Sequence, residues 1–285
     1  MQNPSTLIVA TDGREQSDGA IRAGHWLAET DVAWRVVSVV PPLPLVSADL
    51  ELQIRADAID ASLENQRRLL HEQLQRVLGS ASTARLDVRQ GHPADVVCRT
   101  AEDTNASLIV AGLGRRRLVD RLLADETALR IIRCATTPVL AVPPEFMPAP
   151  HTAIVGVDFS ETSVRAAELA LRLVQSAATI YLMNVAPRED VLSLATSGLA
   201  AYEAHAMPKL NDLAQRLQAP ERVHLQPVIK QGDPATALLE YASETNSELI
   251  AIGTRGLGLV ARLLLGSVAT KVIRASSIAA LTVPA

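Results

Sequence analysis

The sequence is poor in aromatic residues, which make up 2% of its 285 positions. A core with so few rings must be built from Ala, Val, Leu and Ile, and little remains that could stack on the bases of single-stranded nucleic acid. Basic charge is also scarce, because 27 Lys and Arg residues face 31 Asp and Glu residues and leave a net charge of −4. Acidic residues outnumber basic ones in both halves of the chain. Since duplex binding requires a basic surface, we expect no nucleic-acid partner.

Long apolar runs and closely spaced cysteines are missing as well. The longest uncharged apolar stretches, such as 36–46, contain prolines and are too short to span a bilayer. No basic segment followed by an apolar run marks a secretory signal, so we expect a cytoplasmic protein without membrane contact. Cys98 and Cys134 lack CxxC spacing, which favours two buried free thiols over a disulfide or a ligand pair. The six His residues form no HxxxH or HExxH pair, so no metal site is expected.

A short motif in the first half of the chain is repeated in the second. Gln-Gly-His-Pro-Ala at 90–94 reappears as Gln-Gly-Asp-Pro-Ala at 231–235, an offset of 231 − 90 = 141. The same offset aligns 108–112 with 249–253, whereas Asp12 and Asp158 near the start of each half align at an offset of 158 − 12 = 146. The chain is therefore a duplicated domain. We expect domains at 1–143 and 151–285, joined by a proline-stiffened linker at 144–150.

Each half alternates short apolar runs with longer amphipathic segments. The runs predict strands at 6–11, 33–39, 86–89, 108–111 and 138–142, and again at 152–157, 179–185, 223–229, 249–252 and 279–283. Segments at 17–29, 48–78, 163–175 and 191–217 have helical spacing, and further helices begin at Ala94 and Ala235 and end near Cys134 and Ala275. Strands that alternate with helices predict an α/β fold with two tandem doubly wound five-stranded parallel sheets.

Glycines of the second half gather after its fourth predicted strand. The pattern is Gly253-x-x-Gly256, then nine residues, then Gly266-Ser267 at the start of a helix. Glycine allows a backbone to approach an anion closely, and a helix N-terminus offers unpaired amides to a phosphate. Ligands of open α/β sheets bind at the carboxyl ends of strands, where Asp158 also lies, so we expect a phosphate site there. The alternative is that these glycines only shape a turn.

Other ligand motifs fit less well. There is no GxxxxGK[ST] sequence, and the partial fingerprint at Gly112-x-Gly114 has Arg117 where its third glycine is needed. A phospho-acceptor receiver domain would need an acidic cluster after its first strand and a Lys after its last, and both halves lack them.

With these motifs the second half resembles the universal stress protein family, and the resemblance covers nearly all of both halves. It implies a tandem member whose sheets have the strand order 3-2-1-4-5 of adenine nucleotide α-hydrolase-like proteins. It also implies ATP binding, which occurs in many members and not in others. The resemblance assigns ribose and adenine to Val157 and Asp158, and adenine to the backbone of Val185. It assigns the phosphates to Gly253, Gly256, Gly266, Ser267 and Val268, and counts Ile252 among the nucleotide-binding residues without a more specific role.

Two departures from the family pattern limit these assignments. Ala269 stands where some nucleotide-binding members carry a hydroxyl residue, which leaves an accompanying Mg²⁺ open. In the first half, Gly256 maps to Arg115, and Gly266 and Ser267 map to Asp125 and Glu126. Each carboxylate would repel a phosphate by about 3 kcal/mol at ~5 Å and an effective dielectric constant of about 20. We therefore expect no ATP in the first half, where Arg115 either lies in a solvated loop or pairs with Asp125 or Glu126.

These observations predict a stress-response regulatory protein that binds ATP in its second half only and is not an enzyme. No general base is identifiable near the phosphates, although slow hydrolysis stays open. One alternative is a scaffolding stress protein in which both sites are silent. Another is an adenylating enzyme of the related α-hydrolase group, but 159–162 has no glycine-rich loop for pyrophosphate.

The last strand of each half would leave an exposed edge that must be paired. Family members commonly dimerise through this strand. We therefore expect Val139–Val142 to pair with Leu281 to Val283 in a pseudo-dimer within one chain, and a further homodimer stays open.

Overall fold

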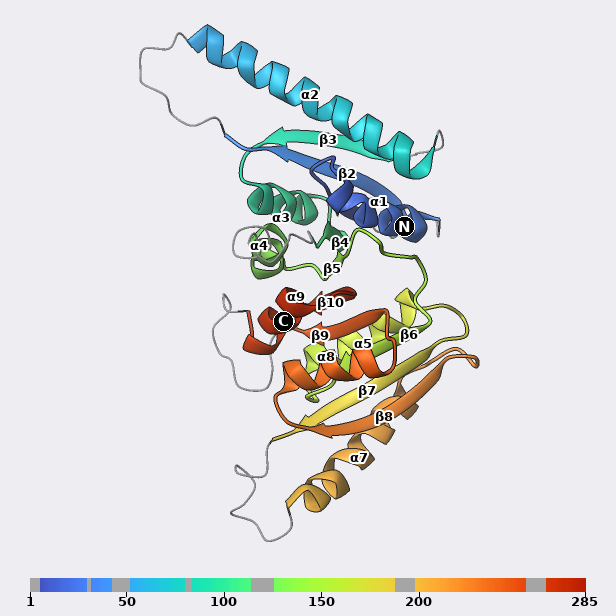
Figure 1. Ribbon diagram of the computed structural model, residues 1–285. Helices are drawn as coiled ribbons and strands as arrows, with labels where there is room; N and C mark the ends of the chain where they lie inside the picture. The colour runs from blue at the N-terminus through green and yellow to red at the C-terminus, as the bar shows by residue number, and fades with distance from the viewer. Residues whose placement is uncertain are drawn as a thin grey trace. The chain divides into compact units, whose positions relative to one another are not determined.

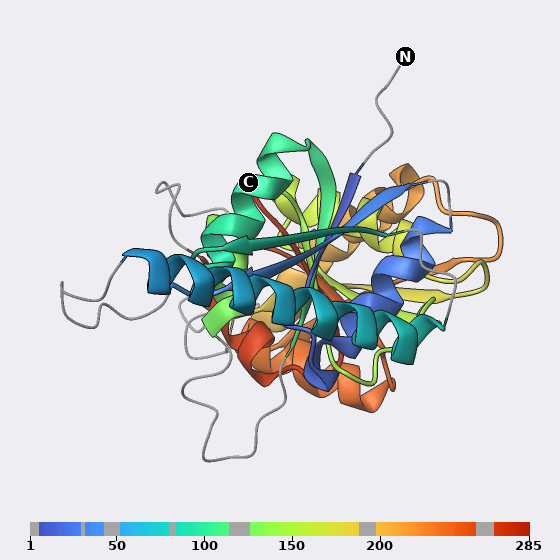
Figure 2. The same ribbon diagram turned by 90° about the horizontal axis from the view of Figure 1, so that it is seen from above.

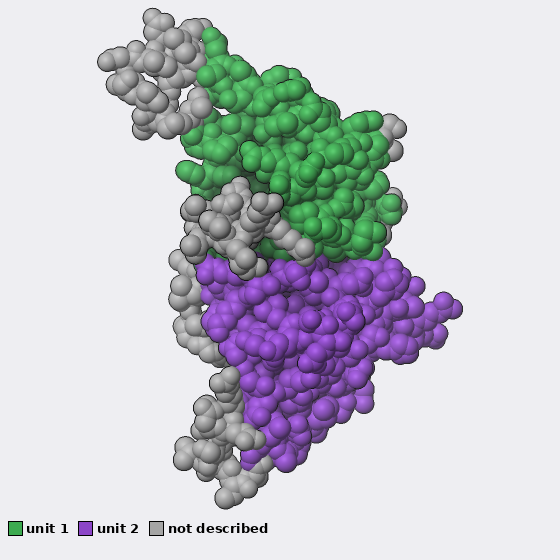
Figure 3. Space-filling model, viewed as in Figure 1, with its two compact units in different colours: residues 1–148 green, residues 149–285 purple. Residues whose placement is uncertain are grey.

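The computed structural model describes residues 6–29, 32–42, 52–79, 84–113, 126–187, 198–254 and 265–285. The chain forms two compact units, Met1–Pro148 and Ala149–Ala285, which are coloured separately in Figure 3. The boundary between the units lies inside the predicted linker at 144–150.

Unit 1 is built on a sheet whose described strands all pair in parallel. Strand β1 lies at the centre, between β2 and β4; β3 pairs with the outer side of β2, and β5 with the outer side of β4. The middle residues of β1 are fully or almost fully buried, as expected for a parallel sheet that is covered on both faces. The strands are β1 (Thr6–Ala10), β2 (Ala33–Val40), β3 (Arg85–Gln90), β4 (Ala106–Gly112) and β5 (Val139–Val142).

Two pairs of helices cover the sheet of unit 1 (Figure 1). Helix α1 (Asp18–Ala28), preceded by the 3-10 turn η1 (Glu15–Ser17), contacts α2 (Leu52–Leu78), which is seen along its length in Figure 2. Helix α3 (Pro93–Asp103) contacts α4 (Glu126–Cys134). Right-handed crossovers lead outward from β1 to β3 and back towards β5, so the two pairs lie on opposite faces.

Unit 2 repeats this arrangement. Strand β6 lies between β7 and β9, β8 pairs with β7, and β10 pairs with β9, all in parallel. Pro227 lies in β8, an edge strand of this sheet, where the missing N–H of proline is tolerated. The elements are β6 (Thr152–Gly156), α5 (Glu161–Leu173), β7 (Thr179–Ala186), α7 (Gly198–Arg216), β8 (His224–Gln231), α8 (Pro234–Glu244), β9 (Leu249–Gly253), α9 (Ser267–Ala275) and β10 (Ala279–Val283).

The repeated Gly-x-Pro motif begins one helix in each unit, as the sequence predicts. Pro93 and Pro234 are the first residues of α3 and α8, where a missing N–H costs nothing. In unit 2 the preceding Asp233 caps the helix, because its Oδ1 accepts from the Thr236 amide at 3.1 Å. A hydrogen bond from Lys271 Nζ at 3.0 Å, together with the bonds from Thr236, lowers the pKa of Asp233. In unit 1 this cap position holds His92, whose side chain makes no capping bond.

The predicted long helices are observed: α2 covers Leu52–Leu78 and α7 covers Gly198–Arg216. The predicted starts at 48 and 191 cannot be compared. Residues 43–51 and 188–197 lie outside the described part of the chain. No described helix combines the length and the apolar character that a membrane span requires.

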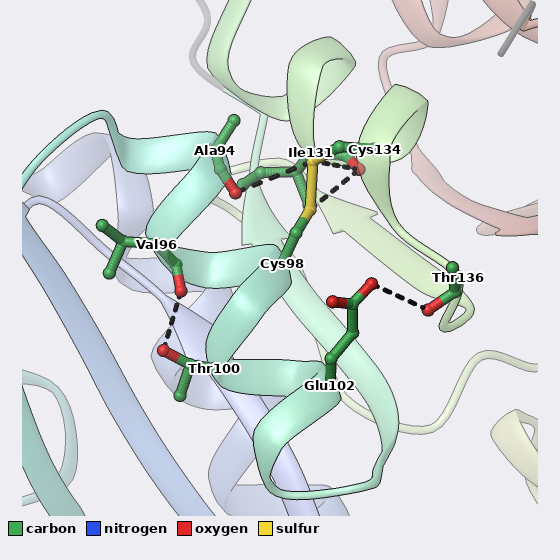
Figure 4. The surroundings of a disulfide bond; sticks show 8 residues. All are labelled: Ala94, Val96, Cys98, Thr100, Glu102, Ile131, Cys134 and Thr136. Atoms are coloured by element: carbon green, nitrogen blue, oxygen red, sulfur yellow. Dashed lines mark hydrogen bonds between the residues drawn. A yellow bond between two sulfur atoms is a disulfide. The ribbon is translucent and has the colours of Figure 1, made fainter.

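The prediction of two free thiols is wrong, because Cys98 and Cys134 form a disulfide (Figure 4). Their spacing of 36 residues gave no sign of proximity. Cys98 lies on α3 and Cys134 is the last residue of α4, and packing of these two helices brings the Cα atoms to 6.4 Å, within bridging range.

Candidate functional site

Unit 2 contains a cavity of about 340 Å³ at the carboxyl ends of its strands, a size typical of small-molecule sites. It lies where β6 and β9 end side by side, β7 continues past β6, and α9 begins. Its lining is Gly156, Val157, Asp158, Ser163, Met183, Asn184, Val185, Pro234, Leu238, Ile252, Gly253, Thr254, Gly266, Ser267, Val268 and Ala269.

One side of this cavity is formed by backbone at the end of β7. The β6–β7 pairing ends at Gly156 and Met183, followed by one more bond from the Val157 amide to Met183 O at 2.8 Å. Val185 lies beyond this point, still paired with Lys230 of β8 on its other side. The Val185 backbone therefore faces the cavity on the side where β6 has already ended.

A hydrogen-bonded pair of polar side chains holds this corner of the cavity in place. Asn184 is 5% exposed; its Nδ2 donates to Val157 O at 2.7 Å, and its Oδ1 accepts from the Tyr202 hydroxyl at 2.8 Å. The two bonds connect the ends of β6 and β7 to helix α7. The Val157 carbonyl thus already has a donor within the chain.

Asp158 follows directly after β6 and is half-buried. Its Oδ1 accepts from the amide of Ser160 at 3.0 Å and from its hydroxyl at 2.5 Å. Within the described part of the chain, Oδ2 makes no hydrogen bond and no ion pair. The residue between them, Phe159, has φ 64°, a left-handed conformation that is costly for any residue with a Cβ. The turn thus fixes the direction of one carboxylate oxygen of Asp158.

The opposite end of the cavity is the N-terminus of α9. Gly266 is the N-cap, and its amide donates to Thr254 O at 2.9 Å, which joins the start of the helix to the end of β9. The first intrahelical bond is from Thr270 N to Gly266 O, so the amides of Ser267, Val268 and Ala269 have no partner in the helix. No side chain caps this end, and its first turn contains no acidic residue. Among the described residues these three backbone donors have no hydrogen-bond acceptor, and together with the positive end of the helix dipole they suit an anion.

The floor of the cavity is apolar. Met183, Leu238, Ile252 and Ala269 line it and also belong to the buried core between the sheet and helices α8 and α9. An apolar floor with hydrogen-bonding groups at its two ends suits a ligand with a flat apolar body and an anionic end.

The structure brings eight of the nine predicted site residues to this one cavity. The ninth, Gly256, falls in 255–264, outside the described part of the chain. The eight come from β6, β7, β9 and α9 and the residues beside them: Val157, Asp158, Val185, Ile252, Gly253, Gly266, Ser267 and Val268. No cluster of three or more His, Cys, Asp or Glu residues that could hold a metal is found among the described residues.

Sequence reasoning missed the Asn184–Tyr202 pair. A signal for Asn184 was present, because it is a polar residue in an otherwise apolar strand and precedes Val185. Tyr202 had no comparable signal, since only the packing of α7 brings it to Asn184.

The corresponding corner of unit 1 is filled by its own side chains. Ser38, which aligns with Asn184 at the 146 offset, accepts from Gln66 Nε2 at 2.9 Å. The same Nε2 donates to Asp12 O at 2.9 Å, so Gln66 of α2 spans the ends of β1 and β2. Asp12 Oδ1 accepts from the Ser17 hydroxyl at 2.8 Å and the Arg14 amide at 3.1 Å.

Ser17 also packs on the glycine that aligns with Gly253. A Cβ placed on Gly112 would lie 3.1 Å from Ser17 Cα, so the η1 turn rests directly against the end of β4. In unit 2 the residue aligned with Ser17 is Ser163, which lines the cavity. Arg115 and Asp125 lie outside the described residues, as does the side chain of Glu126.

Comparison with known proteins agrees with the duplication. The model of the universal stress protein family matches residues 5–143 and again 150–284. A universal stress protein of Mycobacterium tuberculosis is 28% identical over 306 aligned residues, covering 94% of this chain and 91% of the relative. The crystal structure of a universal stress protein from Archaeoglobus fulgidus, 20% identical, superposes with a TM-score of 0.71 over 100% of this chain and 99% of its own. A solved universal stress protein in complex with cAMP is 30% identical over 47% of this chain and 97% of its own, with a TM-score of 0.35. The chain therefore belongs to the universal stress protein family, and both of its units are copies of the family domain.

Proposed function

We propose that this protein is an ATP-binding regulator of the stress response that takes up the nucleotide in unit 2 only. The observation that carries the proposal is the cavity of unit 2, which joins an apolar floor to the uncapped N-terminus of α9. Binding there would change conformation or partner choice, and catalysis would be slow or absent.

The nucleoside end of ATP suits the side of the cavity formed by β6 and β7. The adenine ring would lie on Met183, Leu238 and Ile252, with its edge hydrogen-bonded to the backbone of Val185. Asn184 already donates to the Val157 carbonyl, so Val185 is the main adenine partner in this proposal. The unpartnered Oδ2 of Asp158 would accept a hydrogen bond from a ribose hydroxyl.

The phosphates suit the other end. At the N-terminus of α9 three unpaired amides and the Ser267 hydroxyl lie together as hydrogen-bond donors. The helix dipole also favours negative charge at this point. Gly253, which lacks a side chain, leaves room for phosphate oxygens close to the backbone, whereas the missing side chain of Gly266 lets α9 begin directly against Thr254 O. Mg²⁺ would arrive with the triphosphate, since the described residues offer no acidic cluster of their own.

The filled corner of unit 1 supports the restriction to unit 2. The Gln66 and Ser17 side chains take up the polar groups that a nucleoside would need, and the η1 turn rests on Gly112.

Photolabelling of the full chain with 8-azido-ATP, followed by peptide mapping, tests the proposal. Label should appear only in peptides from 149–285, and excess ATP should prevent it. The duplicated chain offers a matched pair of variants: Asp158→Asn should weaken binding about tenfold through loss of a charged hydrogen bond, whereas Asp12→Asn should have no effect. Specific label in peptides from 1–148, or equal effects of the two variants, would contradict the proposal.

We further propose an intramolecular pseudo-dimer in which Val139–Val142 pairs with Leu281 to Val283. Within its own unit β5 pairs with β4 and β10 pairs with β9, so each is the last strand on its side of that unit's sheet, the position from which strands add to another sheet. A chain whose edges satisfy one another should be monomeric in light scattering, whereas a homodimer would indicate that the edges pair between chains.

A further inference from the structure

The disulfide of unit 1 has one buried and one accessible half. Cys98 is 6% exposed, whereas Cys134 is exposed. Cys134 also lines a second cavity, of about 400 Å³, and Cys98 does not. Cys134 is therefore the half of the disulfide that borders this cavity.

The charge around this cavity favours an anionic ligand. Arg130 and Arg133 of α4 line it together with the first turn of α3, where His92 precedes Pro93, and Asp95 is the acidic residue among the described lining. The Arg133 guanidinium and the positive end of α3 thus border the cavity.

Unit 2 shows what has changed at this place. At the 141 offset His92 aligns with Asp233 and Arg130 with Lys271, and there the aspartate caps the helix and binds the lysine. Unit 1 has an imidazole where unit 2 has the capping carboxylate, and an arginine where unit 2 has the lysine.

The crosslink is not required for the helices to pack. Cys98 and Cys134 align with Leu239 and Ala275 of unit 2, where α8 and α9 contact each other without any disulfide. The equivalent pair α3 and α4 should therefore stay packed when the bond is broken.

Backbone carbonyl groups lie close to both sulfur atoms and could accept hydrogen bonds from the thiols of the reduced form. Cys98 Sγ lies 3.6 Å from Ile131 O, and Cys134 Sγ lies 3.5 Å from Ile131 O and 3.7 Å from Ala94 O (Figure 4). After reduction, each thiol would have a carbonyl acceptor, so neither S–H would be left unsatisfied.

We propose that Cys98 and Cys134 form a reversible thiol–disulfide exchange site and that the cavity beside Cys134 binds an anionic low-molecular-weight thiol. This proposal is independent of nucleotide binding in unit 2. The incoming thiolate forms a bond to Cys134 Sγ, and the Cys98–Cys134 bond breaks with its electron pair going to Cys98 Sγ, which takes a proton from water. A second thiolate then attacks the sulfur of the bound thiol and releases a low-molecular-weight disulfide and the Cys134 thiolate. The net reaction oxidises two small thiols and reduces one protein disulfide, and the corresponding small disulfide reverses it.

The chain is well suited to a test, because these two are the only cysteines in its sequence. In Cys98→Ser only Cys134 can react, and in Cys134→Ser only Cys98. Each reduced variant is mixed with anionic glutathione disulfide or with cationic cystamine, and the mixed disulfide is followed by intact mass. A circular dichroism spectrum like that of the wild type confirms folding, and Cys98→Leu, which copies Leu239, serves as a second variant with Cys134 alone.

Cys134 should react at least tenfold faster than Cys98, because only the former lines the cavity. For Cys134, the rate with glutathione disulfide divided by the rate with cystamine should be about tenfold higher in the folded chain than in the same chain unfolded in urea. The reason is that the charged cavity concentrates anions. Arg133→Gln should reduce that preference. Equal rates for the two cysteines, a preference no greater than in the unfolded chain, or an unchanged preference in Arg133→Gln would overturn the proposal.

Discussion

Replacing Ser267 by Glu should separate nucleotide binding from stability, because the two should change in opposite directions. Ser267 is exposed, is the first residue of α9, and lies at a helix end that has no acidic residue. A carboxylate at this position interacts favourably with the helix dipole, by about 0.3–1 kcal/mol. The thermal stability of unit 2 should therefore stay the same or rise slightly.

The same carboxylate should nearly abolish ATP binding. A negative charge ~5 Å from a phosphate, at an effective dielectric constant of about 20, costs about 3 kcal/mol. That energy corresponds to a loss of affinity of about 100-fold. Ser267→Ala is the matched control, since it removes one hydroxyl and should cost about 1 kcal/mol, or less than tenfold.

Equilibrium titration with a fluorescent ATP analogue, with thermal unfolding of the same samples, measures both effects. A Ser267→Glu variant that binds as tightly as the wild type would show that the phosphates do not lie at α9. A variant that loses affinity and stability together would show that the substitution damages the helix, and the electrostatic reasoning would be refuted.

Four further changes give expected results. In Gly266→Ala, the new Cβ would lie 2.9 Å from Thr254 O, so α9 must shift away from β9. ATP affinity should then fall about tenfold, because the shifted helix would lose one hydrogen bond to the phosphates. Unchanged affinity in the same titration would show that the close contact between Gly266 and Thr254 is not needed. Tyr202→Phe removes the 2.8 Å bond to Asn184 and should destabilise unit 2 by about 1 kcal/mol in urea unfolding; no change would mean that water replaces the hydroxyl. Burial raises the pKa of Asp87, but hydrogen bonds and charges from Arg89 and Arg35 outweigh it and lower that pKa overall, so this carboxylate stabilises unit 1 above about pH 4 and loses its effect as the pH falls through the lowered pKa. In Asp87→Asn the urea midpoint of unfolding should therefore fall less steeply as the pH is lowered below about 4. An unchanged pH dependence would contradict a stabilising role of the Asp87 carboxylate. Reduction of Cys98–Cys134, which are 36 residues apart, should cost up to about 4 kcal/mol on the chain-entropy model and lower the melting temperature of unit 1 by about 10 °C without affecting unit 2; equal shifts in both units would contradict it.

The elements of the fold were accessible from sequence because their signals are local. Apolar runs identified strands such as β4 and β9, and the Gly-x-Pro motif identified the starts of α3 and α8 at Pro93 and Pro234. The convergence of Asp158 and Gly266 also followed from a general rule, since the carboxyl ends of adjacent parallel strands share one edge of the sheet.

What the sequence could not supply depends on packing between distant segments. The Cys98–Cys134 bond exists because α3 and α4 lie side by side, and a spacing of 36 residues carries no trace of that. The Gln66 and Ser17 side chains at the strand ends of unit 1 were not anticipated either, whereas the predicted obstacles to phosphate, Asp125 and the side chain of Glu126, lie outside the described residues. The disulfide and the position of Gln66 both depend on how helices pack against the rest of unit 1, and a local sequence pattern does not predict that packing.

The two units share one fold but differ in the polar side chains at their strand ends. The strands of both units are mostly apolar and buried, whereas the polar side chains near their carboxyl ends, such as Ser38 and Asn184, differ between the units. Gln66 in unit 1 and the Asn184–Tyr202 pair in unit 2 bind the ends of equivalent strands by different hydrogen bonds.

Isothermal titration calorimetry of the full chain with ATP tests the central claim most directly. The account predicts one site per chain, abolished by Ser267→Glu and retained in Asp12→Asn. Two sites per chain, no binding at all, or a site that survives Ser267→Glu would contradict it.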